Sequence, residues 1–316
     1  MKVLITGGLG YLGGRLTQFL ETQSDYEIVL GTRQEIELSQ WQQHAQVRQI
    51  QWNSANCLHN VCEGINIVVH TAGMNAQDCA ADPIAAFEFN AVATARLLQA
   101  AIQQGVKRFI YFSTAHVYKS PLVGIFTEET CPVALHPYAT SHRAGEDLVR
   151  AAHQRGEIEG VVVRLSNAFG APANKTANCW MLLVNDLCRQ IVETQRIVLR
   201  TPGLQRRDFV PIRDVCHAIN HLMHIPKYSL GKGLFNIGGM WSPTVWEMSC
   251  LIQKRCEKLL GFKPEINRPS SQSDEYPDEF NYHINTLLNT GFQLNSDRVD
   301  EIDNLLIFCN TSFSRH

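Results

Sequence analysis

The feature that most constrains the fold is a glycine-rich turn between a short apolar run and a helical pattern. Val3-Leu4-Ile5 leads through Thr6 into the glycines, and Leu16, Phe19 and Leu20 then recur at helical spacing. Glycines allow a tight turn, a close approach of backbone N–H groups to a pyrophosphate, and packing of the helix on the strand. The pattern predicts a dinucleotide-binding turn, whose expected cofactor contacts are Gly7, Gly10, Tyr11, Leu12 and Gly13.

More apolar runs continue the alternation of strands and helices, and several end in small or hydroxylated residues. They cover 27–30, 47–50, 65–70 and 108–112, and a long amphipathic helix is predicted from Phe87 to Ala101. Ligands bind at the carboxyl ends of parallel strands, and small residues there let the backbone come close. We therefore expect contacts at these ends, from Thr71, Ala72, Gly73, Ser113 and Thr114.

Arg33 bears on the choice of cofactor. It follows the strand 27–30, where an NAD-binding chain usually carries an acid for the ribose 2′-hydroxyl. No carboxylate occurs at 31–33, and a guanidinium there can meet a 2′-phosphate. We expect NADP, with NAD as the alternative if Arg33 is a solvated loop residue.

A polar stretch from Pro137 to Glu146 resembles the start of a helix. If it is helical, Tyr138 and His142 lie four residues apart on one face, so that a phenol and an imidazole address the same ligand. This is a predicted proton-transfer pair. Such pairs occur on many helices, so the weight of this one depends on the rest of the chain.

The second half carries a candidate anion site. After the strand 160–165 the regular alternation fades, and adjacent arginines, Arg206 and Arg207, follow a turn. Because the net charge is only −2, an anionic ligand has to be held by local groups. The fork of an arginine suits a diphosphate.

Taken in order, these motifs resemble one family, the extended short-chain dehydrogenases/reductases, in the branch of NAD(P)-dependent enzymes that modify nucleotide sugars. The motifs that carry the resemblance are Thr-Gly-Gly-x-Gly-x-x-Gly at 6–13, His-x-Ala at 70–72, Asn90, Ser-Thr-x-x-Val-Tyr at 113–118, Pro-Tyr at 137–138, Arg-x-x-Asn at 164–167, Gln-x-Arg-Asp-Phe-Val at 205–210 and Phe-Asn-Ile-Gly at 235–238. The resemblance covers nearly the whole chain.

The resemblance implies an α/β fold, with a doubly wound parallel Rossmann sheet and a smaller, interleaved substrate-binding domain. The dinucleotide-binding domain is expected at 1–167, with 209–240 returning to it. The substrate-binding part is expected at 168–208 and 241–316. A homodimer through the helices 87–101 and 138–152 is also a family expectation.

The resemblance also implies roles for the residues of the catalytic site. Tyr138 corresponds to the acid/base, Thr114 orients the substrate oxygen, and His142 stands where the family normally has lysine. In the family that lysine also holds the nicotinamide ribose, so Tyr138 and His142 are expected cofactor contacts as well. An imidazole can still donate to a ribose hydroxyl, but with a reference pKa of about 6.5 it supplies only part of a charge at neutral pH. Asn53 stands where an Asp beside the adenine is usual, and Asn90 completes the expected cofactor contacts.

Three substrate-binding residues follow from the resemblance in the same way. Asn167 is expected to contact the nucleotide sugar and Arg207 to hold its diphosphate. Arg268 is expected to close the nucleotide site.

The leading prediction is an NADPH-dependent reduction of a keto-deoxy-sugar nucleotide. An epimerase with tightly bound NAD is the alternative within the family. A 4,6-dehydratase is less favoured, because Ala115-His116 replaces the Asp-Glu that follows the threonine in such enzymes. A non-catalytic dinucleotide-binding sensor or scaffold is the alternative of another class, motivated by His142 and Asn53.

Composition removes several other partners. A pI near 6.6 gives no general field for nucleic acid or an anionic membrane. The ten cysteines form no Cys-x-x-Cys pair and the twelve histidines show no paired-ligand spacing, so we expect no metal. The residues 1–8 match neither a signal peptide nor a membrane span, and we expect a cytoplasmic protein.

Overall fold

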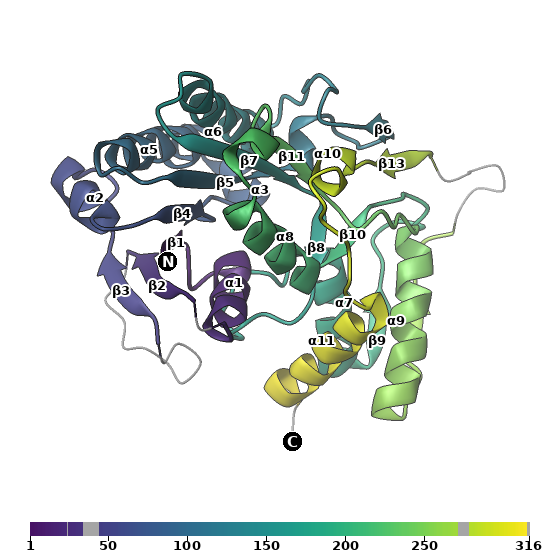
Figure 1. The fold of residues 1–316 in the computed structure, drawn as a ribbon. Helices are drawn as coiled ribbons and strands as arrows, with labels where there is room; N and C mark the ends of the chain where they lie inside the picture. Colours follow the sequence, from purple (N-terminus) through teal and green to yellow (C-terminus); the bar gives the residue numbers. More distant parts are fainter. Residues whose placement is uncertain (24, 34–43, 271–277, 315–316) are drawn as a thin grey trace.

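A seven-stranded parallel sheet is the framework of the computed structural model, which describes residues 1–23, 25–33, 44–270 and 278–314 (Figure 1). Every neighbouring pair in this sheet is parallel. The strands in order across the sheet are β11 (Leu234–Ile237), β7 (Glu159–Leu165), β5 (Arg108–Thr114), β4 (Ile67–His70), β1 (Lys2–Thr6), β2 (Glu27–Thr32) and β3 (Gln46–Gln49). The order reverses between β1 and β4, which is where open sheets of this kind bind ligands. The predicted doubly wound α/β fold is confirmed.

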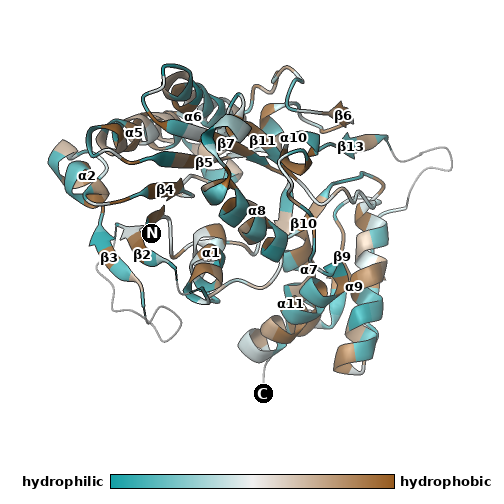
Figure 2. Cartoon of the chain, viewed as in Figure 1, coloured by the Kyte–Doolittle hydropathy of each residue, from teal (hydrophilic) through white to brown (hydrophobic). Residues whose placement is uncertain are grey.

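Helices cover both faces of this sheet, because its inner strands, such as β1, β4 and β5, are largely apolar and buried along their length (Figure 2). On one face α1 (Tyr11–Glu21) packs against α8 (Ile212–His224). The opposite face carries α2 (Ala55–Cys62), α5 (Thr94–Gln103) and α6 (Pro137–Gln154).

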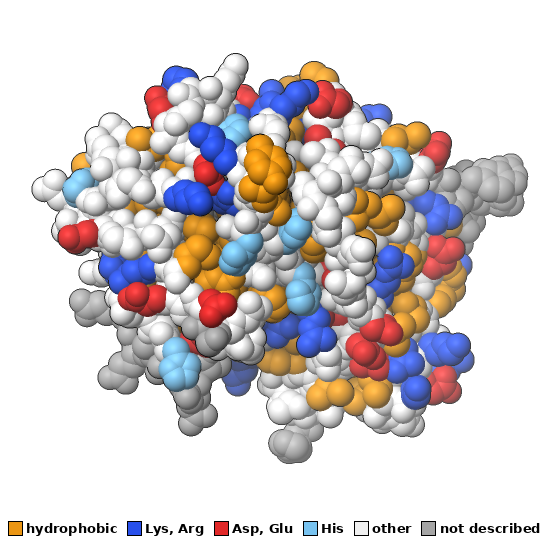
Figure 3. Space-filling model, viewed as in Figure 1, with side chains coloured by type: hydrophobic (Ala, Val, Ile, Leu, Met, Phe, Trp, Pro, Cys, Tyr) orange, Lys and Arg blue, Asp and Glu red, His pale blue; other side chains and the backbone are white. Residues whose placement is uncertain are grey.

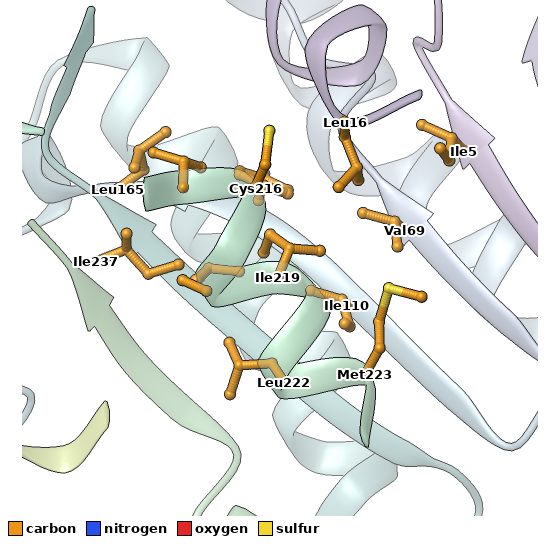
Figure 4. Close-up of a cluster of buried hydrophobic side chains, with 14 of the residues drawn as sticks. Ile5, Leu16, Val69, Ile110, Leu165, Cys216, Ile219, Leu222, Met223 and Ile237 are labelled. Carbon is orange, nitrogen blue, oxygen red and sulfur yellow. The ribbon is translucent and has the colours of Figure 1, made fainter. Parts of the chain in front are cut away.

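Alternation along the strands divides the core into two layers. Ile5 and Ile110 join Leu16 and Ile219 in the layer under α1 and α8 (Figure 4). Tyr111, the next residue of β5, lies in the other layer, under α5 and α6.

The helical pattern predicted from Phe87 to Ala101 is not one α-helix. α3 (Ala76–Ala81) and α4 (Pro83–Phe87) precede a π-helix, η2 (Glu88–Ala93), which then runs into α5. Asn90 lies in this wider turn, and its carbonyl accepts hydrogen bonds from the Thr94 hydroxyl at 2.8 Å and the Tyr111 hydroxyl at 3.3 Å. Two hydroxyls thus donate to one backbone carbonyl of the wider turn, and such π-turns are frequent at functional sites.

A second group of helices surrounds a core of its own, at the lower right of Figure 1. These helices are α7 (Leu183–Thr194), α9 (Val245–Leu260) and α11 (Arg298–Phe313). Three two-stranded parallel pairs lie outside the main sheet: β8 (Asn167–Phe169) with β10 (Phe209–Pro211), β9 (Arg196–Val198) with β12 (Glu265–Asn267), and β6 (Gly124–Phe126) with β13 (Phe280–Tyr282). The short helices are η3 (Ala115–Val117), η4 (Lys227–Leu230) and α10 (Asn285–Leu288).

The strand predicted at Phe209 pairs with β8, and Asp208 anchors the chain there. Its buried carboxylate accepts hydrogen bonds from the Ser166 hydroxyl at 2.5 Å and from the backbone N–H groups of Gly239 and Trp241. The run that begins at Leu234 does join the sheet, as β11. The division into domains stays a prediction.

The surface carries charges of both signs in mixture over the face shown in Figure 3. None of the helices in the described ranges is long and apolar enough to cross a membrane. Within those same ranges, no group of three or more His, Cys, Asp or Glu side chains is placed to hold a metal ion.

Candidate active site

The glycine loop between β1 and α1 has the shape that a dinucleotide pyrophosphate needs. Gly7 has a φ of +69°, and a Cβ on it would lie 3.0 Å from the Ala72 nitrogen. A Cβ on Gly13 would overlap the Gly7 carbonyl. Gly10 begins α1 without a side-chain cap, so the first-turn N–H groups of Tyr11 and Leu12 remain available to an anion. The residues present therefore fit the cofactor phosphates.

The side chain of Tyr11 has another partner. Its hydroxyl donates to the Gly170 carbonyl at 3.1 Å, and the Asn185 amide donates to the same carbonyl at 2.9 Å. Burial is the largest cause that raises the pKa of the Tyr11 phenol. Tyr11 can thus serve a cofactor only through its backbone, while its phenol joins α1 to the loop after β8.

The segment 71–73 connects the glycine loop with α6. The Thr71 hydroxyl donates to the Thr6 carbonyl at 2.7 Å, which holds the segment against the end of β1. A Cβ on Gly73 would lie 3.4 Å from Cε1 of His142. Asn90 holds the far end of the segment, because its Oδ1 accepts from the Met74 N–H at 2.8 Å and its Nδ2 donates to Ser141 at 3.0 Å. The Asn90 side chain thus positions the segment and α6.

Tyr138, His142 and Thr114 meet where β5 ends beside α6. Pro137 is at the start of α6, and the His136 ring accepts a hydrogen bond from the Tyr138 N–H at 3.2 Å, which fixes the first turn. The rings of Tyr138 and His142 pack edge to face with centroids 4.6 Å apart. The Thr114 hydroxyl accepts from the His116 N–H at 3.2 Å and hydrogen-bonds the Tyr138 phenol. The structure therefore brings the predicted catalytic residues together.

Burial controls the ionisation of this pair. It raises the pKa of Tyr138 above 10.0, and the hydrogen bond with Thr114 opposes the rise. Burial also lowers the pKa of His142 from 6.5 to about 4. The expectation that His142 supplies part of a positive charge at neutral pH is therefore wrong, because the ring is 7% exposed and neutral.

Ser113, expected at the cofactor, faces a buried ion pair instead. Its hydroxyl donates to Glu146 at 2.5 Å, and Glu146 pairs with Arg164 at 2.6 Å. The Arg164 guanidinium lies 4.6 Å from the ring centre of Tyr118. We did not predict this cluster from the sequence, although Glu146 lies four residues after His142 and so on the same face of α6.

Arg33 and Asn53 lie at the outer end of the sheet and are exposed. The Arg33 guanidinium lies 5.5 Å from the ring centre of Phe89. The Asn53 side chain accepts a hydrogen bond from Arg96 of α5. Residues 34–43, which follow Arg33, are outside the described ranges.

A cavity of about 260 Å³ opens at His116, two residues after Thr114. Its lining includes His116, Asn167, Arg206 and Arg207. The Asn167 amide donates to the Asp208 carbonyl at 2.9 Å, which orients the loop. Two arginines line the cavity, which suits a diphosphate, and Asp278 and Phe280 line it as well.

The two adjacent arginines differ in their partners. Arg206 donates to the Ser242 carbonyl at 2.9 Å and lies 3.6 Å from Glu247. No carboxylate of the described residues forms an ion pair with Arg207, and burial lowers its pKa. Arg207 is thus the arginine with a guanidinium left for a ligand.

Arg268 contacts the turn that precedes Arg206, at Pro202. Its guanidinium is 3.6 Å from the ring centre of Trp246 and donates to the Pro202 carbonyl at 2.8 Å. The side chain is exposed, and its predicted contact with a nucleotide stays a prediction.

Comparison with known proteins assigns the chain to a family. The NAD dependent epimerase/dehydratase family matches residues 3–238. The chain belongs to this family. It is thus an enzyme of the extended short-chain dehydrogenase/reductase type, which confirms the resemblance.

Among the relatives of this epimerase/dehydratase family member is the dTDP-D-glucose 4,6-dehydratase of Mus musculus, 28% identical over 283 residues, or 85% of this chain and 75% of the relative. UDP-glucuronic acid decarboxylase 6 of Arabidopsis thaliana is 24% identical over 88% of this chain and 81% of its own length. Among solved structures, UDP-glucuronic acid 4-epimerase from Bacillus cereus in complex with NAD has a TM-score of 0.82 at 22% identity, covering 99% of this chain and 100% of that one. This last likeness supports the fold.

Proposed function

We propose that this enzyme moves hydride to and from a nucleotide-linked sugar and that Tyr138 is its acid/base. The observation that carries the proposal is the meeting of Tyr138, Thr114 and His142 at the end of β5, beside the segment 71–73 that packs on the glycine loop. His116 links the two parts, since its N–H donates to Thr114 at 3.2 Å and its side chain lines the cavity. A sugar held there by Arg207 would reach Thr114 and Tyr138.

The cofactor and the side chains of the site have separate roles in this proposal. The dinucleotide supplies the hydride donor and acceptor when it is bound. The Thr114 hydroxyl holds the reacting sugar oxygen, and the Tyr138 phenol gives a proton to that oxygen or takes one from it. Arg207 and Asn167 bind the diphosphate and the sugar at the other side of the cavity.

We favour a cycle without net oxidation, as in an epimerase. The names of the family and of these relatives describe epimerisation, loss of water and decarboxylation, none of which consumes NADPH overall. Reduction of a keto-sugar by NADPH, the leading expectation from the sequence, remains the second candidate. A non-catalytic role is disfavoured, because the family is one of enzymes.

NAD has better support than NADP as the cofactor. The family is named for NAD, and NAD is bound in the Bacillus cereus epimerase structure. Arg33 alone supports NADP, since it stands exposed at the end of β2. Fluorescence titration with NADH and NADPH, repeated on Arg33→Ala, decides this. A loss of affinity confined to NADPH would establish Arg33 as a contact of the 2′-phosphate.

The test of function uses a panel of UDP- and dTDP-linked hexoses, with sugar conversion followed by NMR and cofactor absorbance recorded in parallel. We expect one sugar to be converted without a net absorbance change. Tyr138→Phe should lower turnover about 100-fold or more, which is the usual contribution of a general acid/base. Tyr228→Phe is the matched control, because Tyr228 is 87% exposed on η4.

The outcomes separate the candidates. Oxidation of NADPH with a keto-sugar would establish the reductase. Full activity in Tyr138→Phe, or no conversion of any sugar with either cofactor, would contradict the proposal.

We also propose a homodimer through α4, η2 and α6. These helices pack on one another and expose Ile84, Phe87, Val92 and Leu148. Exposed apolar side chains on adjacent helices are typical of a subunit interface. Light scattering should give a dimer for the wild type and a monomer for Phe87→Asp. The cytoplasm stays the proposed compartment.

A further inference from the structure

Tyr111 is a buried titratable residue that the proposed reaction does not use. It lies on β5 and is 1% exposed, with its ring between those of His70 and His142, whose centroids are 5.7 and 6.0 Å away. Its hydroxyl lies 3.0 Å from Nδ1 of His142. Nδ1, one of the two nitrogens of the imidazole, therefore has the Tyr111 hydroxyl as its hydrogen-bond partner.

The other edge of the His142 ring faces the segment 71–73. A Cβ on Gly73 would lie 3.4 Å from Cε1 and 3.6 Å from Nε2 of His142. The glycine therefore leaves room beside the Nε2 edge on the side where the cofactor is proposed to bind. The Phe112 backbone also forms a hydrogen bond with the ring and opposes the lowering of its pKa by burial. A neutral imidazole has one N–H donor and one acceptor, so the partner of Nδ1 determines what Nε2 offers.

The Tyr111 phenol is set to donate. Burial, followed by the nearby Glu146 carboxylate, raises its pKa, so the hydroxyl keeps its proton. Its other acceptors, the carbonyls of Asn90 at 3.3 Å and of His142 at 3.4 Å, are more distant than Nδ1. The Asn90 carbonyl already accepts from Thr94 at 2.8 Å.

We infer that Tyr111 is a positioning residue that holds His142 as the neutral Nε2–H tautomer, so that an uncharged imidazole donates a hydrogen bond toward a ribose hydroxyl of the dinucleotide. The tautomer follows from the geometry of the protein alone. Only the identity of the acceptor rests on the proposed function. His142 would then make the hydrogen bond to the ribose that a lysine makes at this position in the family, but without the positive charge of the lysine.

The first test reads the tautomer without any cofactor. Long-range ¹H–¹⁵N NMR distinguishes Nε2–H from Nδ1–H histidines, and comparison with His142→Gln assigns the signal among the twelve histidines. We expect the Nε2–H pattern in the wild type and its loss in Tyr111→Phe. The matched control is Tyr118→Phe, because this buried phenol donates to Asn236. An Nδ1–H pattern in the wild type, or an unchanged pattern in Tyr111→Phe, would overturn the inference.

The second test measures NADH affinity in a double-mutant cycle. Tyr111→Phe and His142→Gln should each weaken binding about 3- to 10-fold, the effect of one neutral hydrogen bond, and the double variant should lose no more than either. Additive losses would show that Tyr111 acts independently of His142 and would reject the positioning role. If the wild type binds no dinucleotide, the proposed function fails, while the NMR result still decides the tautomer.

Discussion

The imidazole of His142 packs against the phenol of Tyr138 edge to face, 4.6 Å between ring centres, and it does so as an uncharged group. Burial lowers the pKa of His142 to about 4 and raises that of Tyr138. The proposed acid/base, Tyr138, therefore has no cation from position 142 beside it, and we expect its ionisation to depend on Thr114 and on the bound ligands.

His142→Lys should shift the pH–rate profile of sugar oxidation to lower pH by about 1 to 3 pH units, because an adjacent positive charge favours the phenolate of Tyr138. The measurement is turnover against pH at saturating sugar. His142→Gln is the control, since it removes the ring and adds no charge. A Lys profile that superposes on that of the wild type would show that position 142 exerts no electrostatic control.

Arg207→Gln should raise the KM for the nucleotide sugar about 10- to 100-fold, because a charged hydrogen bond to the diphosphate is lost. Arg206→Gln, its neighbour, should change KM little, since Arg206 already has Ser242 and Glu247 as partners. Initial rates over a range of sugar concentrations give both values. Equal effects of the two changes would refute the assignment of Arg207.

Stability should fall as the pH drops below about 6.5. Burial lowers the pKa of His70 to about 3 and that of His142 to about 4, each from 6.5, so between these limits the unfolded chain binds protons that the folded chain does not. The free energy of unfolding is then fully present above pH 6.5 and is lost toward acid pH. Between pH 7.5 and pH 5.0, protonation of each histidine in the unfolded chain should lower the free energy of unfolding by about 2 kcal/mol.

Urea denaturation at these two pH values measures the loss. His70→Gln should be less stable at pH 7.5, because the hydrogen bonds of His70 with Thr6 and Thr94 are disturbed. Its pH dependence should nevertheless be smaller than that of the wild type by about 2 kcal/mol. An equal slope in both proteins would exclude His70 as a source of the acid sensitivity.

Glu146→Gln should destabilise the fold by about 3 to 5 kcal/mol, because it leaves the buried Arg164 guanidinium without a counter-charge. Glu146 is fully buried and Arg164 is 1% exposed. The control is Glu157→Gln, which breaks the surface pair with Arg155 and should leave the denaturation midpoint unchanged. A similar, small effect of both changes would show that the buried pair is not needed for stability.

The sequence was sufficient for the strands of the main sheet, the glycine loop and α6, because each has a local signal. Apolar runs mark β1, β5 and β7, and Pro137 marks the start of α6. Such local sequence signals do not indicate which distant residue a side chain contacts in the folded protein. The contact of Tyr111 with His142 depends on how α6 lies on β5, and the difference between Arg206 and Arg207 depends on where Glu247 falls.

The π-helix at 88–93 shows the same limit in another form. Its side chains keep a helical periodicity, so the pattern was read as one α-helix. The wider turn is accompanied by distant partners, namely Met74 and Ser141 on the Asn90 side chain and Tyr111 on its carbonyl. A periodicity of apolar residues contains no information about these polar contacts.

The Gly170 carbonyl accepts hydrogen bonds from both Tyr11 and Asn185. This shared acceptor limits how segments of such enzymes can be exchanged in a chimaera. Tyr11 opens α1 beside the glycine loop, whereas Asn185 belongs to α7 in the second group of helices. A chimaera that joined this Rossmann sheet to the second group of helices of another relative would have to carry over both donors and the turn at Gly170, whose φ is +140°. The seam between the two halves therefore runs through three residues that have to be exchanged as one unit.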